Sequence, residues 1–212
     1  MFEIIEKYGV TILYTAPTLI RTWMKWGDEF PNKFNLSTLR LLGSVGEPIN
    51  PEAWMWYREV IGGGRCPIVD TWWQTETGWA ITANPRGIET LPIKPGSSTV
   101  PVPGYKVEVV DGKGNHVAAG EEGNIVIKLP MPPGTLAGLW GRPDGYQKAY
   151  LDAFGGYYAT GDSGYIDKDG YVFVMGRTDD VINVAGHRLS TGSMEAVLAT
   201  HPAVAECAVI GV

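Results

Sequence analysis

Residues 1–70 alternate between helix-type and strand-type patterns, and this alternation constrains the fold more than any other feature. Apolar, β-prone runs predict strands at residues 10–14, 39–45 and 67–69, and helical spacing predicts helices at residues 2–8, 17–24 and 50–60. Gly9 is suited to end the first helix, and Asn50 followed by Pro51 is typical of a helix start. Strands that alternate with helices pair in parallel, so this part is predicted to form a doubly wound sheet.

The pattern changes near residue 84. From there to Arg177, short β-like runs alternate with turns rich in glycine and proline, of which the chain has 28 and 15. Antiparallel strands are predicted at residues 105–110, 124–129, 164–167 and 171–175, and residues 130–144 read as a loop. We expect a small antiparallel barrel or a distorted sandwich here.

A third pattern follows Arg177, with a strand predicted at residues 181–184, a helix at 193–200 and a further strand at 204–212. The predicted fold class is therefore α/β: a parallel α/β part, a small antiparallel β-barrel-like subdomain, and the start of an α+β domain. The corresponding boundaries are residues 1–86, 87–177 and 178–212.

Composition excludes several classes of function. The chain has 212 residues, 44% of them hydrophobic and 19% charged, which is typical of a globular protein. Its formal charge of −6 and lack of a basic stripe argue against nucleic acid as a partner. No apolar run approaches the roughly 18 residues of a membrane span, so no membrane partner is expected. Cys66 and Cys207 show no disulfide or metal spacing, and we expect a cytoplasmic location.

The richest polar stretch is residues 70–78, Asp-Thr-Trp-Trp-Gln-Thr-Glu-Thr-Gly, which follows the third predicted strand. It holds more hydrogen-bonding groups than a buried strand can use. In an open α/β sheet, ligands bind beyond the carboxyl ends of the strands, where this stretch would lie. The alternative is a polar strand-to-loop transition with two packing tryptophans.

Three other polar clusters also lie at the ends of predicted elements. Residues 43–48 form a glycine-containing turn, residues 158–162 place Asp162 where a carboxylate can bind a ribose diol, and residues 176–188 supply Arg177 and Arg188. Arginine suits bidentate phosphate contacts. Each cluster alone also fits an ordinary turn or a solvated linker.

In their order and spacing, these clusters resemble the ATP-dependent, AMP-forming acyl-CoA synthetases of the adenylate-forming superfamily. The resemblance is carried by residues 14–18, 43–52, 70–78, 160–162 and 176–189, and it is closest to the short-chain acetyl-CoA and propionyl-CoA synthetases. It implies a ligase that activates acetate, propionate or 3-hydroxypropionate with ATP and transfers the acyl group to coenzyme A. The implied cofactors are ATP (AMP), Mg²⁺ and coenzyme A, and the implied partners are small molecules.

The resemblance also implies a role for each site residue. Gly46, Glu47 and Pro48 would line the adenine side of the nucleotide site, which Asp70, Thr71 and Trp72 would close. Gln74 would belong to the same site, Thr75 would donate to the α-phosphate, and Glu76 would hold Mg²⁺. Asp162 would bind the ribose with Arg177 beside it, and Arg188 would reach a phosphate. Thr75, Glu76 and Arg188 are therefore the predicted catalytic residues.

The acyl pocket and the domain movement are predicted in the same way. Trp73 would form the floor of the pocket and limit the acyl chain to about two or three carbons, and Val45 would line it. Asp179 would be the hinge about which the C-terminal domain turns, and Gly186 would line the coenzyme A passage.

The resemblance is to an internal piece of such a synthetase. The phosphate loop and a catalytic lysine would lie outside residues 1–212, so this piece alone is expected to be inactive, with the rest of a parent chain as its partner. Two alternatives remain at this point: a luciferase-like oxidoreductase of the same superfamily, and a non-catalytic nucleotide-binding fragment. The bulk of Trp73 counts against a luciferin-sized substrate.

Overall fold

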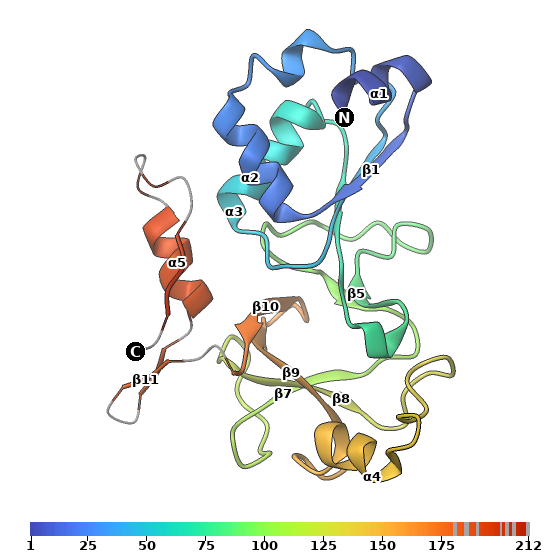
Figure 1. The fold of residues 1–212 in the computed structure, drawn as a ribbon, viewed down its shortest axis with the longest axis vertical. Coiled ribbons are helices and arrows are strands. Elements are labelled where there is room, and N and C mark those ends of the chain that lie inside the picture. Colours follow the sequence, from blue (N-terminus) through green and yellow to red (C-terminus); the bar gives the residue numbers. More distant parts are fainter. Residues whose placement is uncertain are drawn as a thin grey trace.

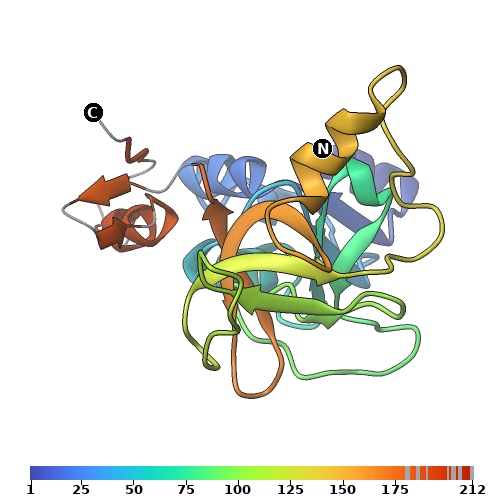
Figure 2. The same ribbon diagram turned by 90° about the horizontal axis from the view of Figure 1, so that it is seen from below.

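The computed structural model describes residues 1–179, 182–184, 187–189, 191–199, 201, 204 and 207–210. Figure 1 shows the helices and strands of the first 70 residues at one end of the molecule and the antiparallel strands at the other. The last described elements lie beside this body, as Figure 2 also shows from below.

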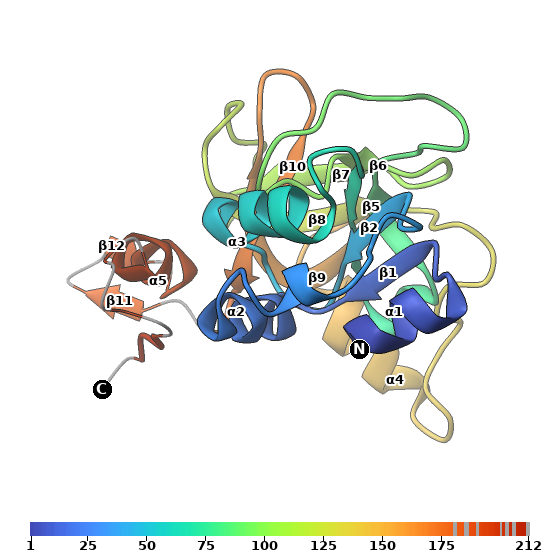
Figure 3. The same ribbon diagram turned by 90° about the horizontal axis from the view of Figure 1, so that it is seen from above.

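The N-terminal part is a parallel α/β unit, as predicted. Its strands are β1 (Ile12–Thr15), β2 (Leu41–Ser44) and β3 (Ile68–Asp70), and its helical elements are α1 (Phe2–Tyr8), α2 (Pro17–Trp26), η1 (Pro31–Lys33), α3 (Pro51–Trp56) and η2 (Tyr57–Ile61). The sheet order is β1-β2-β3, and both neighbouring pairs are parallel. Figure 3 shows the three α-helices gathered around β1 and β2.

Local sequence explains where these helices begin and end. Gly9 has a left-handed backbone with φ 61°, and its N–H caps α1 by donating to the carbonyl of Ile5. Pro17 occupies the first turn of α2. The Asn50 side chain accepts a 2.9 Å hydrogen bond from the amide of Ala53, so the predicted cap of α3 is confirmed.

One hydrophobic core lies between these helices and the parallel sheet. Trp23, Tyr57 and Leu42 are fully buried in it, and the Tyr57 hydroxyl donates to the carbonyl of Leu13, 3.1 Å away. This bond gives the phenol a partner, as a buried hydroxyl requires.

The rest of the body is antiparallel and contains two sheets, whereas antiparallel strands were predicted only after residue 84. The first consists of β4 (Trp72–Trp73), β5 (Ala80–Ala83) and β6 (Val100–Pro101), and the second has the order β10-β9-β8-β7. The strands of the second are β7 (Val107–Val110), β8 (Gly123–Lys128), β9 (Tyr157–Ile166) and β10 (Val172–Arg177). Within the described strands β7 and β10 are the edges, so this sheet is open and not a closed barrel.

A second core packs on the four-stranded sheet. Its fully buried members include Ile125, Ile127, Tyr158 and Val172, and Trp72 packs against them from the segment that follows β3. The remaining helical elements are η3 (Thr75–Thr77), α4 (Pro143–Tyr146) and η4 (Gln147–Leu151). Trp72 thus brings the end of the parallel unit against the antiparallel core.

Beyond Arg177, the described elements are β11 (Ile182–Val184), β12 (His187–Leu189) and α5 (Thr191–Ala199). The predicted strand is confirmed for residues 182–184 and the predicted helix for residues 193–199. The strand predicted at residues 204–212 is wrong for residues 204 and 207–210, which are not in a strand. A strand needs a partner for its backbone, and the only strands described here, β11 and β12, pair with each other.

No helix in the described ranges is both long enough and apolar enough to cross a membrane.

Candidate nucleotide and acyl site

The polar stretch 70–78 begins at the end of β3 and continues as β4 and the short turn η3. The Thr77 hydroxyl stabilises the turn, because it accepts from the amide of Gln74 at 3.1 Å and donates to the Gln74 carbonyl at 2.8 Å. Gly78 ends it with a left-handed φ of 70°, a conformation that favours glycine. The side chains of Gln74, Thr75 and Glu76 are thereby held on one rigid turn.

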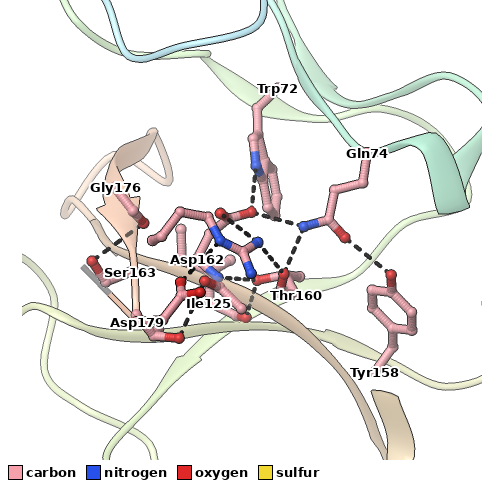
Figure 4. Close-up of polar contacts among 12 residues, drawn as sticks. Trp72, Gln74, Ile125, Tyr158, Thr160, Asp162, Ser163, Gly176 and Asp179 are labelled. Carbon is pink, nitrogen blue, oxygen red and sulfur yellow. Dashed lines mark hydrogen bonds and ion pairs between the residues drawn. The ribbon is translucent and has the colours of Figure 1, made fainter. Parts of the chain in front are cut away.

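Asp162 is the centre of a hydrogen-bond network that joins this stretch to β9 (Figure 4). Its Oδ2 accepts from the indole Nε1 of Trp72 at 3.0 Å and from Nε2 of Gln74 at 2.9 Å. Gln74 Nε2 also donates to the carbonyl of Thr160 at 2.6 Å. The Asp162 side chain is only 10% exposed, and this burial raises the pKa of the carboxyl against the effect of its donors.

Arg177 lies on the other side of Asp162, at the end of β10. Its Nη1 lies 3.4 Å from Oδ1 of Asp162 and 3.2 Å from the carbonyl of Thr160, while its Nε donates to Asp179 at 3.1 Å. One guanidinium therefore contacts both the predicted ribose carboxylate and the predicted hinge residue. The nearby carboxylates of Asp162 and Asp179 raise the pKa of Arg177, although its burial acts in the opposite sense.

A pocket of about 600 Å³ opens beside this network. It is lined by Ala16, Val45, Gly46, Trp73, Gln74, Thr75, Glu76, Tyr150, Thr160 and Arg177. This volume lies in the range typical of small-molecule sites. The pocket brings together residues from the turn after β2, from the stretch 70–78 and from the end of β10, three of the segments that carry the motifs.

Trp73 and Val45, the two residues assigned to the acyl pocket, both line this pocket. Trp73 is 42% exposed, so its indole is available to a ligand. The structure therefore places a bulky aromatic wall beside Thr75 and Glu76, although their roles toward a substrate stay predictions.

Asp70 and Thr71 lie next to the pocket and contact Ser44 at the end of β2. Asp70 pairs in register with Ser44 across β2 and β3, and burial raises the pKa of its carboxyl to about 7. The Thr71 hydroxyl donates to the Ser44 carbonyl at 3.1 Å and lies 2.6 Å from the Tyr14 hydroxyl. Neither residue is among those that line the pocket.

Of the three residues Gly46, Glu47 and Pro48, only Gly46 lines the pocket. It has a φ of 94°, and a Cβ there would meet open space. Glu47 instead points to α2, where its carboxylate accepts from the amide of Thr18 at 2.9 Å and from Arg21 at 2.7 Å. Burial opposes ionisation of Glu47, but these donors prevail and its pKa is lowered. Pro48 is exposed and does not line the pocket.

Sequence reasoning missed Tyr150 and did not assign Ala16 or Thr160 to the pocket they line. The Tyr150 hydroxyl donates to Oε1 of Glu76 at 2.8 Å. Tyr150 belongs to η4, a helical segment just after the predicted loop 130–144, and the spacing of Tyr146 and Tyr150 by four residues was the available signal.

Three further predicted site residues belong to the segment from residue 179 to residue 188. The backbone of Arg188 is in β12, in register with Asn183. Gly186 lies outside the described residues. Asp179 is described, and it is exposed apart from its contact with Arg177.

The described residues contain no group of three or more histidine, cysteine, aspartate or glutamate side chains placed to hold a metal. A single carboxylate, Glu76, lies on the pocket wall. This donor set fits Mg²⁺ held by one carboxylate and the phosphates of a nucleotide, which is a common arrangement for this ion.

The comparison with protein families decides the class of this site. Residues 1–140 match the family described as AMP-binding enzyme. The chain belongs to this family. The match ends within the loop before α4, so it includes the polar stretch 70–78 and the turn after β2. The predicted resemblance to adenylate-forming enzymes is confirmed.

Two relatives with high sequence identity to this chain are acetyl-coenzyme A synthetases. The chain is 56% identical over 212 residues to the acetyl-coenzyme A synthetase of Thiobacillus denitrificans, covering 99% of this chain and 32% of that protein. It is 52% identical over 211 residues to the acetyl-coenzyme A synthetase of Pyrobaculum arsenaticum, covering 100% of this chain and 31% of that protein. The chain thus spans about a third of the length of these AMP-binding relatives.

A solved structure of an AMP-binding relative has the same fold. The crystal structure of the anthranilate CoA ligase AuaEII in complex with anthranoyl-AMP superposes with a TM-score of 0.83 at 34% identity. The superposition covers 99% of this chain and 38% of that chain. The α/β class predicted from the sequence is therefore confirmed.

Proposed function

We propose that this chain forms the nucleotide and acyl site of a ligase that activates a short carboxylic acid with ATP. The acid would be acetate, propionate or 3-hydroxypropionate. Its carboxylate would attack the α-phosphate, forming an acyl-adenylate as pyrophosphate leaves, and the thiol of coenzyme A would then displace AMP. Membership of the AMP-binding family and the acetyl-coenzyme A synthetase relatives support this reaction.

The observation that carries the proposal is the position of Asp162 beside the pocket. Two donors, Trp72 and Gln74, occupy its Oδ2, while the only contact of Oδ1 with a described residue is the longer one with Arg177. Oδ1 is therefore the oxygen that a ribose hydroxyl would reach. The two donors orient the carboxylate before a nucleotide binds, which lowers the cost of ordering it in the complex.

The other pocket residues would act around the phosphates and the acid. Thr75, on the exposed start of η3, would donate to the α-phosphate, and Arg177 would add positive charge near the ribose. Glu76 would hold Mg²⁺, which supplies charge neutralisation on the phosphates when bound. Trp73 would leave room only for a short acyl chain. Asp179 would be the hinge, and Arg188 and Gly186 would serve the phosphate and coenzyme A from the segment that follows.

The test is acid-dependent exchange of labelled pyrophosphate into ATP, measured on the full-length protein that carries this chain. Acetate, propionate and 3-hydroxypropionate are compared by kcat/KM, and thioester formation is then followed with coenzyme A. Exchange with a short acid supports the proposal and identifies the acid. Binding of ATP without exchange would support a non-catalytic nucleotide module instead, and oxygen consumption with light emission would support the luciferase-like alternative.

A further inference from the structure

Three tyrosine rings stand in a row next to the turn that carries Gln74, Thr75 and Glu76. The rings of Tyr150 and Tyr158 are stacked, with centroids 5.2 Å apart and planes inclined by 5°. Tyr146 continues the row, with its centroid 5.7 Å from that of Tyr150. Tyr146 and Tyr150 come from α4 and η4, and Tyr158 comes from β9.

The two stacked tyrosines bond to the residues on either side of Thr75. The Tyr150 hydroxyl donates to Oε1 of Glu76 at 2.8 Å, and the Tyr158 hydroxyl donates to Oε1 of Gln74 at 3.0 Å. Figure 4 shows the second of these bonds, with Tyr158 pointing toward Gln74. The pair therefore fixes both flanks of the residue that would contact the α-phosphate.

Stacking of Tyr150 on Tyr158 holds the Tyr150 ring in place. Tyr158 is fully buried in the second core and cannot move without disturbing that packing. Tyr150 lies against it on the pocket wall, and a tyrosine ring has only two side-chain torsions to fix.

The bond from Tyr150 engages only one of the two carboxylate oxygens of Glu76. Oε1 is engaged by Tyr150, whereas Oε2 accepts no hydrogen bond from any described residue. A carboxylate with one oxygen fixed has a defined direction for the other, and such outer contacts commonly set the affinity of a metal ligand.

We propose that Tyr150, supported by Tyr158, is a positioning residue that fixes Oε1 of Glu76 and thereby directs Oε2 at a metal–triphosphate complex in the pocket. This inference rests on the proposed function, because it assigns Glu76 to the metal of bound ATP. It adds a residue from the helical segment 143–151 to a site otherwise built from the motifs.

The experiment compares Tyr150→Phe with the matched control Tyr146→Phe in the full-length protein. Both changes remove one hydroxyl from the row, but the Tyr146 hydroxyl makes no hydrogen bond to a described residue. The dissociation constant of ATP is measured by calorimetry with Mg²⁺ and again with EDTA. In Tyr150→Phe, we expect affinity with Mg²⁺ to fall about 10-fold and affinity with EDTA to stay unchanged. Tyr146→Phe should match the unmutated protein in both.

Each contrary result has a separate meaning. Unchanged affinity of Tyr150→Phe with Mg²⁺ would overturn the positioning role alone. An equal loss with Mg²⁺ and with EDTA, or an equal loss in Tyr146→Phe, would also overturn it, because it would reflect general disturbance of the segment. Failure of the unmutated protein to bind ATP would overturn the proposed function and this inference with it.

Discussion

The indole Nε1 of Trp72 donates to Oδ2 of Asp162 across 3.0 Å, although 90 residues separate them in the chain. This bond ties the end of the parallel unit to the longest strand of the antiparallel sheet. It also holds the carboxylate that would bind a ribose.

Replacing the Trp72 donor should lower both the stability of the fold and its affinity for ATP. Trp72→Phe keeps an aromatic ring but loses the N–H, and Asp162 keeps its other donors. We expect the free energy of unfolding to fall by about 1–2 kcal/mol, since hydrogen bonds to charged groups are the stronger ones. Urea unfolding and ATP titration measure the two effects. Trp79→Phe is the control, because Trp79 is 72% exposed, and a loss as large in this variant would contradict the explanation.

Burial of Asp70 predicts an unusual dependence of stability on pH. Its pKa rises from 3.8 to about 7 on folding, so between these values the folded chain retains a proton that the unfolded chain has released. Stability should therefore fall as the pH rises from about 4 to about 7, by up to about 4 kcal/mol.

Asp70→Asn removes this titration and isolates its effect. Urea midpoints are measured from pH 4 to pH 8 for both proteins. The difference in their free energies of unfolding should grow in favour of the variant as the pH rises. A constant difference over this interval would show that Asp70 keeps an ordinary pKa.

Trp73 should set the acyl length. Trp73→Gly removes the indole from the pocket wall, and we expect kcat/KM for a six-carbon acid relative to acetate to rise by at least about 10-fold. Pyrophosphate exchange with a series of straight-chain acids gives this ratio, and Trp79→Gly, which replaces a tryptophan that does not line the pocket, is the control. An unchanged preference would show that another wall limits the chain.

Gly164 should tolerate no side chain. A Cβ at this residue would lie 2.0 Å from the backbone oxygen of Phe173 on the paired strand β10. Gly164→Ala must therefore displace one strand, and we expect a loss of about 1–3 kcal/mol in unfolding free energy. At Gly112 a Cβ meets nothing within 4 Å, so Gly112→Ala should be neutral. Equal unfolding midpoints for the two variants would be the contrary result.

Local signals were sufficient for most of the fold. The Asn50 cap, Gly9 and the strand before Asp70 each depend on residues close in sequence, and each was predictable. The short strands β4, β5 and β6 were not predicted as a sheet, because strands of two to four residues carry almost no periodicity.

In the site too, residues close together in the sequence were predictable, whereas contacts between distant segments were not. Trp73, Thr75 and Glu76 lie within four consecutive residues of the sequence, and all three line the pocket, with Trp73 in β4 and the other two on η3. The bond between Trp72 and Asp162 and the contact of Tyr150 with Glu76 depend on segments 90 and 74 residues apart, which no local pattern reports. Glu47 was placed toward adenine, but its partners Thr18 and Arg21 lie on α2, so only the folded chain shows where its carboxylate points.

The two separate hydrophobic cores have a consequence for cooperativity. A chain with two cores can unfold in two transitions, each melting at its own temperature. The pocket takes Ala16, Val45 and Gly46 from the first core's side and Tyr150, Thr160 and Arg177 from the second. A ligand bound there is lost when either side unfolds, so its binding free energy is added to the transition of the less stable side, which then approaches the transition of the other side. We therefore expect saturating nucleotide to merge two calorimetric peaks into one.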